Sequence, residues 1–481
     1  MITAYADNNL DAKGHAETWA KQFKDFDGLV CIYGYGLGYH AAALLEAAPK
    51  CKAIFFDPIQ KTLRESAKHN RQLLTDDRIA ITNDRGSFQG CFGRMVDRWK
   101  GIRLGALPAY EFAMVSEYTE FSQWFCREVQ TMMSDACTAL RFSTDWTRNY
   151  LENLALVHQA PPIAPALGAW SKLPFIVVSA GPSLNDHKML SALRKLQDRA
   201  MIVCAGSSFR KLQREGINAD MVMSFDGGLS NFFCHFEDMN DTTAPLIADL
   251  IVHHKVFSCY KGPKLLMSVW PGPMLDAMLG VPIGSIRIGP SVANTCFDLG
   301  LKLAADPIIL FAQDLAFTGG KTHASDTHAE WTWFAKGNYE IMAENEACPF
   351  VDTSGKSIIT NHSMITFGHL FNGLIEQLGK NGPKIYNCSH PEGMHINGAE
   401  LITPEKLTEV VSGKDLSELK KSIFKELLNS RPYDLRRCIK ILRLYLDEGT
   451  KLLYRMTYDP DVNFKTIMRH ERIALYFFAL Q

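Results

Sequence analysis

The sequence predicts an α/β protein with parallel, doubly wound sheets. An apolar run at residues 28–33 leads directly into a glycine-rich turn and a helix-like stretch at 40–48. A second apolar run, 51–56, ends at Asp57 before a proline, and the same strand, turn and helix order starts again at residue 174. Short apolar runs that alternate with helical stretches are typical of βαβ units, whose parallel strands are buried on both faces.

The composition is that of an ordinary folded protein. The 481 residues are 47% hydrophobic and 21% charged, which argues against disorder, a fibrous repeat or a small disulfide scaffold. The 51 basic and 52 acidic residues leave a formal net charge of -1, so the charge does not favour binding to nucleic acid. The 12 cysteines form no C-x-x-C pair, which favours reduced thiols over a zinc ribbon or a redox pair.

The sequence favours a cytoplasmic location. Residues 1–23 lack the basic and then apolar plan of a secretory signal. No apolar run reaches the roughly 18 residues that a membrane span needs. We therefore expect a cytoplasmic protein without membrane insertion.

Length and pattern together predict three domains. A domain of about 150 residues is common. The sequence has a helical pattern from about residue 121, and the proline-rich PPIAPALGAW interrupts this pattern. We therefore expect an N-terminal Rossmann-like α/β domain at 1–160 and a central domain at 161–402. From 403 to 481 the chain is rich in Leu, Lys and Glu at helical spacing, which predicts a helical C-terminal domain.

The central domain repeats the order of strand, turn and helix. The expected strands are 174–180, 200–205, 221–225, 307–312 and 384–386. The expected helices are 187–196, 209–215, 292–303 and 367–378. Gly216 suits a left-handed cap after the second of these helices, and Ser291 suits the N-cap of the third.

The glycine-rich turn near the N-terminus has two interpretations. Gly34, Gly36 and Gly38 follow a strand, and Asp57 ends the next one, an arrangement that suits the ribose and phosphate of a dinucleotide or of S-adenosylmethionine. The spacing lacks the third glycine of the dinucleotide fingerprint, and glycines also serve simply to turn a strand into a helix. Whether this loop binds a ligand stays open.

Small and hydroxylic residues follow three successive strands of the central domain. Ligands of open α/β sheets sit outside the carboxyl ends of the strands. Gly181 lets backbone approach a ligand, Ser183 offers a hydroxyl, and Asp226 suits a ribose hydroxyl or a divalent ion. The residues that predict a nucleotide site here are Ser179, Gly181, Pro182, Ser183, Gly206, Ser207 and Asp226. Ordinary turns and helix caps are the alternative interpretation.

A further group lies around another helix start and the strand that follows it. Ser291, Asn294, Gln313 and Phe317 extend the predicted nucleotide site. Asp314, Lys321 and His323 are catalytic candidates, because a cation near a helix N-terminus suits a leaving phosphate. Both Asp226 and Asp314 follow strands, so we expect both carboxylates to face a cleft rather than the core.

His362 is the candidate general base. It lies on an expected loop before the helix 367–378, and an imidazole has the pKa range that a base toward a hydroxyl needs. An exposed or capping histidine is the alternative. His323, His390 and His395 are the competing candidates.

The motifs resemble one known family. VVSAGPSLN, AGSSFRKLQREGINADMVMSFDG and IGPSVANTCFDLGLKLAADPIILFAQDLAFTGGKTHA, in this order, are similar to the motility-associated factor (Maf) family, which glycosylates bacterial flagellin. GYGLGYHAAALLE, IFFDP and EGMHINGAE extend the likeness over most of the chain. The resemblance implies a central Rossmann-like domain similar to sialyltransferases, a GT-A variant, which transfers a pseudaminic or legionaminic acid type of sugar from a CMP-activated donor to Ser or Thr of flagellin.

The resemblance also implies roles for individual residues. A G-P-S loop in sialyltransferases holds the nucleotide, which places Gly181, Pro182 and Ser183 at cytidine monophosphate. An acidic-aromatic motif lies by the donor, where Asp314 and Phe317 stand. The base is a histidine before a helix and a K-I-Y-like strand, an order that matches His362 here. Those enzymes use a tyrosine pair at the phosphate that this chain lacks after Asp314, so leaving-group stabilisation falls to Lys321 or His323.

Two other functions stay open at this point. The central domain also resembles an MptE-like 6-hydroxymethylpterin diphosphokinase, which uses a nucleoside triphosphate and magnesium. A non-catalytic flagellin-binding chaperone is the second alternative. Only isolated carboxylates are available for a metal, so we expect no required cofactor and leave Mg²⁺ open. The expected partners are the CMP-activated sugar and flagellin, and the oligomeric state stays open.

Overall fold

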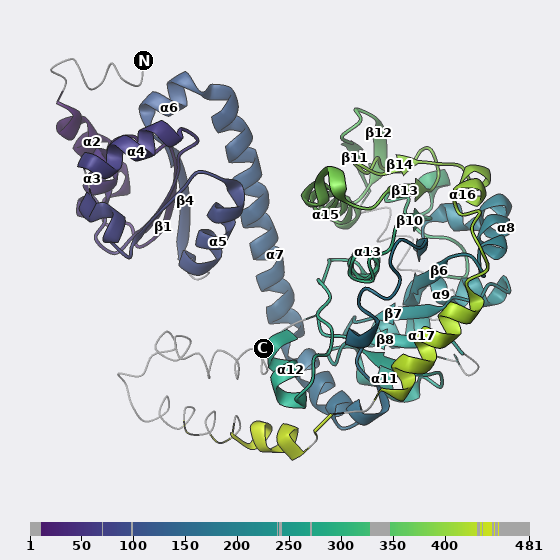
Figure 1. Ribbon diagram of the computed structural model, residues 1–481. Coiled ribbons are helices and arrows are strands. Elements are labelled where there is room, and N and C mark those ends of the chain that lie inside the picture. Colours follow the sequence, from purple (N-terminus) through teal and green to yellow (C-terminus); the bar gives the residue numbers. More distant parts are fainter. Residues whose placement is uncertain are drawn as a thin grey trace. The chain divides into compact units, whose positions relative to one another are not determined.

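The computed structural model describes residues 11–69, 71–97, 100–237, 239, 243–269, 272–327, 347–430, 433–434, 436–444, 447 and 451. The chain divides into two compact units, Met1–Ala139 and Leu140–Gln481, each with its own parallel sheet (Figure 1). The expected α/β class is therefore confirmed. The described residues after 403 lie within the second unit, and the three-domain division with boundaries near 161 and 403 stays a prediction.

The first unit is built on a four-stranded parallel sheet with the order β3-β2-β1-β4. Its elements are α2 (Ala12–Ala20), η1 (Lys21–Phe23), β1 (Gly28–Tyr33), α3 (Tyr39–Ala47), β2 (Lys52–Phe56), α4 (Gln60–His69), η2 (Arg71–Thr75), β3 (Ile79–Thr82), α5 (Arg85–Met95), β4 (Gly101–Ala106) and α6 (Pro108–Ala113). Every residue of β1 is buried, as expected for a central parallel strand. Helix α7 (Val115–Leu154) crosses the boundary between the units.

The second unit contains an eight-stranded sheet with the order β14-β13-β10-β5-β6-β7-β8-β9, and all its paired strands are parallel. The strands are β5 (Phe175–Val178), β6 (Met201–Ala205), β7 (Met221–Ser224), β8 (Leu246–Ala248), β9 (Lys264–Leu266), β10 (Ile308–Phe311), β13 (Ile385–Cys388) and β14 (Glu400–Leu401). A separate antiparallel hairpin consists of β11 (Cys348–Val351) and β12 (Ser357–Thr360).

Helices connect these strands and cover both faces of the sheet (Figure 1). They are η3 (Val157–Gln159), η4 (Ala164–Ala166), η5 (Pro182–Asn185), α8 (His187–Lys195), α9 (Gly206–Arg214), α10 (Leu229–Asn231), η6 (Phe232–Phe236), α11 (His254–Cys259), α12 (Gly272–Leu279), α13 (Val292–Lys302), η7 (Thr318–Gly320), α15 (His362–Leu378), η8 (Gly379–Asn381), α16 (Pro404–Val410) and α17 (Ser417–Asn429).

Side chains of the central strands alternate between two buried cores. Along β5, Ile176 and Val178 pack into a core shared with α8, α9 and the end of α7, while Phe175 and Val177 pack into a core shared with α13, α15 and α17. The period of two along a strand sends successive side chains to opposite faces. Burial on both faces accounts for the continuous apolar runs in the sequence.

Most expected elements of the central region are confirmed within a few residues. Gly216 has the left-handed φ of +65° expected of a cap, and Ser291 caps α13. Two helices begin earlier than expected: α9 starts at Gly206 and α15 starts at His362. Asn361 explains the earlier start of α15, because its side chain accepts a hydrogen bond from the Met364 amide at 2.9 Å.

None of the helices in the described part of the chain is long and apolar enough to cross a membrane.

Candidate functional site

The order of the strands creates a topological switch point between β5 and β10. From β5 the order continues to β6, β7, β8 and β9 on one side, whereas β10, β13 and β14 lie on the other. The connections after two such strands lead to opposite sides of the sheet order, and ligands of doubly wound sheets bind outside the carboxyl ends at this point. The predicted residues 179–183 follow β5 and residues 313–317 follow β10, so both groups lie at the switch point.

Asp314 joins three loops at the carboxyl edge. Its carboxylate accepts hydrogen bonds from the Ser183 amide at 2.7 Å and from the His390 amide at 3.0 Å. Its backbone oxygen accepts from the Met394 amide at 2.7 Å. The residue is 1% exposed, so the expectation that its carboxylate faces a cleft is wrong: burial and two amide donors make Asp314 a positioning residue for these loops.

The loop after β10 is held in a backbone conformation that most residues avoid. Ala312 has a φ of +55° and Leu315 a φ of +52°, on either side of Gln313 and Asp314. A non-glycine residue in the left-handed region costs of order 1 kcal/mol, and such residues cluster at binding sites where the surrounding structure holds them. Ser179 supports this loop through a hydrogen bond from its hydroxyl to the Gln313 side chain.

Position 181 requires glycine because a side chain would not fit there, and not because of its backbone angles. Its φ of -64° is open to any residue. A Cβ atom added at Gly181 would lie 2.4 Å from the Ala312 oxygen and 2.6 Å from an Asp314 carboxylate oxygen. The glycine therefore lets the loops after β5 and β10 meet.

The variant Gly181→Ala tests this close approach. We expect it to lose about 1 to 3 kcal/mol of stability, as overpacked sites do, because a backbone oxygen cannot rotate away from the new methyl group. The matched control is Gly373→Ala in α15, where an added Cβ has no heavy atom within 4 Å. This control should be neutral or slightly stabilising. Urea unfolding measures both, and equal midpoints for the two variants would contradict the assignment.

Four buried polar atoms around this edge have no hydrogen-bond partner in the described part of the chain. They are Ser183 Oγ, Asn294 Oδ1, Asn387 Oδ1 and Ser389 Oγ. Buried polar groups are nearly always paired, so unpaired ones are candidates for contact with a ligand or water. Ser183 and Asn294 were predicted from the sequence. Asn387 and Ser389 were missed, although both follow the expected strand 384–386, a position that served as a site signal after other strands.

The starts of three helices add backbone amides to the same edge. Helix α9 follows β6 directly, while α13 leads into β10 and α15 into β13, so all three helices begin at the carboxyl edge. Ser291 caps α13 by accepting from the Asn294 amide at 3.4 Å. Helix N-termini carry a partial positive charge that favours anions. Ser207 lies half-buried in the first turn of α9, and Asn294 lies buried in the first turn of α13.

Gly206 and Ser208 have structural explanations. A Cβ atom at Gly206 would lie 2.7 Å from the Phe236 ring, so the glycine allows α9 to pack against this aromatic side chain. The Ser208 hydroxyl donates to the Val178 oxygen at 2.9 Å and ties the helix to β5. For Gly206 the packing against Phe236 therefore favours the alternative interpretation, that of an ordinary turn residue, over a nucleotide site.

Asp226 is exposed two residues after the end of β7, and the expectation that its carboxylate faces a cleft stays a prediction. Its carboxylate accepts a hydrogen bond from the Gly228 amide at 2.8 Å. Desolvation by neighbouring groups raises the pKa of the Asp226 carboxyl, and the bond from Gly228 lowers it in part. Unlike Asp314, this carboxylate is available to a ligand.

Two asparagines of α7 hold the loops after β7 and β8. The Asn149 amide nitrogen donates to the Gly227 oxygen at 2.9 Å and the Ile251 oxygen at 3.2 Å. The Asn153 amide nitrogen donates to the Leu250 and Val252 oxygens at 2.9 and 2.8 Å. Residues four apart share one face of a helix, so the spacing of the asparagines explains how one helix binds both loops. This role was not predicted, because residues 1–160 were expected to form a separate N-terminal domain.

The remaining candidates lie on half-buried or exposed positions. Phe317 is half-buried, and its amide donates to the Ile359 oxygen at 2.8 Å. Lys321 is exposed, and His323 is half-buried beside the Thr322 hydroxyl at 3.1 Å. His362 is the exposed first residue of α15 rather than a loop residue. Pro182 opens η5 at the switch point.

The glycine loop of the first unit is closed by its own residues. Asp57 is fully buried and accepts hydrogen bonds from the amides of Tyr35, Gly36 and Ile59 at 3.0, 3.2 and 2.8 Å. The Tyr110 hydroxyl also donates to it at 2.7 Å. The carboxylate is thus occupied by the loop itself, which favours the structural interpretation over a ribose site.

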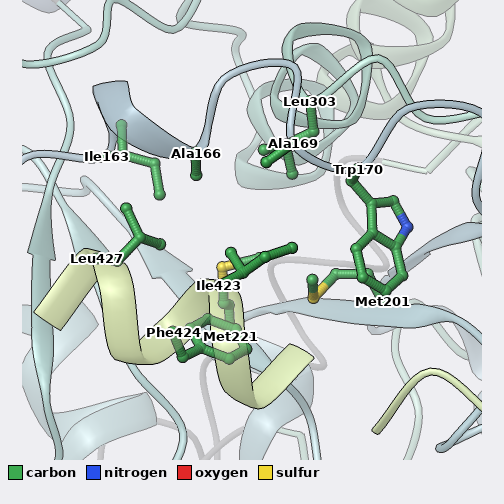
Figure 2. Close-up of a pocket in the computed structure, with 10 residues that line it drawn as sticks. All are labelled: Ile163, Ala166, Ala169, Trp170, Met201, Met221, Leu303, Ile423, Phe424 and Leu427. Carbon is green, nitrogen blue, oxygen red and sulfur yellow. The ribbon is translucent and has the colours of Figure 1, made fainter. Parts of the chain in front are cut away.

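A small apolar pocket lies at the opposite edge of the second sheet (Figure 2). It is lined by Ile163, Ala166, Ala169, Trp170, Met201, Met221, Leu303, Ile423, Phe424 and Leu427. Met201 and Met221 begin β6 and β7, so this is the amino edge. With a volume of about 10 Å³ it has room for no more than a water molecule, and it belongs to the packing of α17.

Comparison with a solved structure extends the likeness over nearly the whole chain. The structure of a MAf glycosyltransferase from Magnetospirillum magneticum AMB-1 matches 98% of this chain and 78% of that one, with a TM-score of 0.56 and 17% sequence identity. The chain has the fold of this Maf glycosyltransferase. The resemblance seen in the motifs is thus confirmed at the level of fold.

Two further comparisons bear on the Maf-like fold. The family described as 6-hydroxymethylpterin diphosphokinase MptE-like matches residues 148–320, which span β5 to β10 and include Asn149. No curated protein matches the sequence.

Among the described residues, no group of three or more His, Cys, Asp or Glu side chains could hold a metal ion.

Proposed function

We propose that the protein is a glycosyltransferase that moves a nonulosonic acid, of pseudaminic or legionaminic acid type, from a CMP-activated donor to Ser or Thr of flagellin. Such a transfer would be needed for flagellar assembly and motility. The observation that carries the proposal is the Asp314-centred switch point, where Ser183 presents a buried hydroxyl without a partner among the described residues. The fold of a Maf glycosyltransferase supports it.

The proposal assigns the donor to the carboxyl edge. The phosphate of CMP would lie by Ser183 and the helix starts at Ser207 and Asn294, where amides and hydroxyls can donate to anionic oxygens. Asp226 would receive a hydroxyl of the ligand. Lys321 and His323 would stabilise the charge that develops on the leaving phosphate, as cations do in transition states of this kind. The resemblance assigns the proton of the acceptor hydroxyl to His362.

Binding of nucleotides tests the donor class. We expect calorimetry to show tighter binding of CMP or CDP than of AMP or GMP. Ser183→Ala should weaken the binding of CMP by about 1 to 2 kcal/mol, which raises Kd by about five- to thirtyfold, because a hydrogen bond to a charged group is lost. The control Ser417→Ala changes an exposed hydroxyl that bonds to Asp198 at the opposite edge and should leave Kd unchanged.

The MptE-like match favours a second candidate, a pterin diphosphokinase. In that reaction a nucleoside triphosphate gives a diphosphate to a pterin alcohol, with magnesium neutralising the phosphate oxygens. The same calorimetry separates the two candidates. A preference for ATP with Mg²⁺ over CMP would replace the sugar transfer by this function.

A further inference from the structure

A histidine outside the predicted site is held in a fixed orientation at the carboxyl edge. His254 is the first residue of α11 and follows the loop after β8. Its ring Nδ1 lies 3.0 Å from Asn149 Oδ1, and its backbone amide donates to the same oxygen at 3.2 Å. No side-chain contact of this kind orients the exposed His362 in the described part of the chain.

The hydrogen bonds of Asn149 determine which ring nitrogen of His254 carries the proton. Its amide nitrogen donates to two carbonyl oxygens, Gly227 O and Ile251 O, so the other end of the amide must be the oxygen. That oxygen can only accept, so the facing Nδ1 of His254 must be protonated. In the neutral ring, Nε2 then has a free lone pair.

The surroundings of the ring favour this neutral form. Desolvation lowers the pKa of His254, and the positive charges of Arg148 on α7 and Lys255 on α11 lower it further, against the opposing charge of Glu152. The neighbouring ring of His253 stacks on it with 4.4 Å between the ring centroids. Burial and the nearby charges lower the pKa of His253 to about 4, so this neighbour also stays neutral near pH 7.

His254 lies beside the loop that carries Asp226. The Asn149 side chain forms hydrogen bonds with both His254 and the Gly227 backbone oxygen. The His253 amide donates to the backbone oxygen of Asp226 at 3.1 Å. In the order of the sheet, β7 lies two strands from β5 and β8 lies three strands from it. Neighbouring strands are about 4.8 Å apart. A donor that extends from Ser183 past the start of α9 would bring its sugar toward Asp226, and an acceptor could approach from the side of β8.

We propose that His254, in place of the His362 that the resemblance assigns, is the base that takes the proton of the acceptor hydroxyl, and that Asn149 is the residue that positions it. This inference rests on the proposed sugar transfer. The acceptor oxygen forms a bond to the anomeric carbon while the bond from that carbon to the phosphate oxygen breaks. The electron pair of the broken bond leaves with CMP, and the hydroxyl proton moves to Nε2 of His254. No further reactant is required.

Single-turnover transfer of the sugar to flagellin tests the role of His254. We expect His254→Ala and His254→Gln to slow transfer about a hundredfold or more, the typical contribution of a general base, while Kd for CMP stays within twofold of wild type. His158→Ala, an exposed histidine in η3, is the matched control and should transfer at the wild-type rate. Wild-type transfer by both His254 variants, with His362→Ala as the slow one, would overturn the inference.

The pH profile separates proton transfer from a structural role. In the wild type, the rate should rise with pH through an acid limb below the usual range of histidine, because the pKa of His254 is lowered. The limb should disappear in His254→Gln. Asn149→Ala should slow transfer less than His254→Ala, since it frees the ring without removing it. A limb retained in His254→Gln would assign the proton to another group.

NMR of histidine labelled with ¹⁵N tests the inference without relying on sugar transfer. The signals missing from His254→Gln identify the His254 ring. We expect them to show a protonated Nδ1 and an unprotonated Nε2 at neutral pH, and Asn149→Ala should change this pattern. The opposite tautomer in the wild type would refute His254 as the base, whereas failure to bind CMP would refute the proposed function.

Discussion

Asp314→Ala is expected to lose both stability and the binding of CMP. The change leaves the amides of Ser183 and His390 without their buried acceptor. Each unsatisfied buried group costs about 1 to 3 kcal/mol, so the free energy of unfolding should fall by about 2 to 6 kcal/mol. The loops after β5, β10 and β13 then lose their common anchor. We expect Kd for CMP to rise at least tenfold in calorimetry at a temperature where the variant is folded.

Two other variants show whether burial causes this effect. Asp314→Asn keeps one acceptor oxygen and should lie between wild type and Asp314→Ala in stability. Asp226→Ala removes an exposed carboxylate with one amide partner, so it should impair transfer with little change in the urea midpoint. Equal stability of Asp226→Ala and Asp314→Ala would show that Asp314 does not anchor these loops.

Lys420→Ala is expected to destabilise the second unit strongly. Lys420 of α17 is 6% exposed and donates to an Asp220 carboxylate oxygen at 2.7 Å and to the Gln197 oxygen. Asp220 in turn accepts from the Ile202 amide at 2.7 Å, next to the start of β7. Breaking a buried ion pair from one side costs about 3 to 5 kcal/mol, because the remaining charge is left uncompensated. Urea unfolding monitored by fluorescence measures the loss.

The cost of Lys420→Ala should depend on pH. Desolvation raises the pKa of Asp220, and Lys420 opposes this rise, so the variant should have a still higher pKa. When a carboxyl has a higher pKa in the folded state than in the unfolded state, its burial costs no stability at a pH below the unfolded pKa. The free energy of unfolding then falls as the pH rises through the folded pKa, because the carboxylate must be charged while buried. The difference from wild type should therefore be largest near pH 7 and shrink on acidification.

Lys421→Ala is the matched control for this prediction. Lys421 is the next residue of α17, but it is exposed and pairs with the exposed Glu418 at 2.7 Å. Such surface pairs contribute about 0 to 1 kcal/mol, so the control should unfold close to wild type at every pH. A loss in Lys421→Ala as large as that in Lys420→Ala would mean that α17 is sensitive as a helix and not through its buried pair.

The local order of the chain could be predicted from the sequence because it depends on short-range patterns. Continuous apolar runs indicated strands buried on both faces, and β1 spans the expected residues 28–33. Ser291 and Gly216 marked a helix start and a helix end through capping geometry that involves only neighbouring residues. The short strands β8 and β9 were missed, because three residues carry too little periodicity.

The tertiary structure decided the role of each polar residue, because burial and partners depend on segments far apart in the sequence. Asp226 and Asp314 both follow strands, yet one carboxylate is exposed and the other is enclosed by amides from residues 183 and 390. Asp57 likewise has the sequence position of a residue that binds ribose, but in the structure four donors of the same unit already occupy its carboxylate. The sequence by itself determined most of the longer strands and the turns that follow them. Only the packing of distant loops determined which of their polar side chains are buried and paired and which are exposed or left without a partner among the described residues.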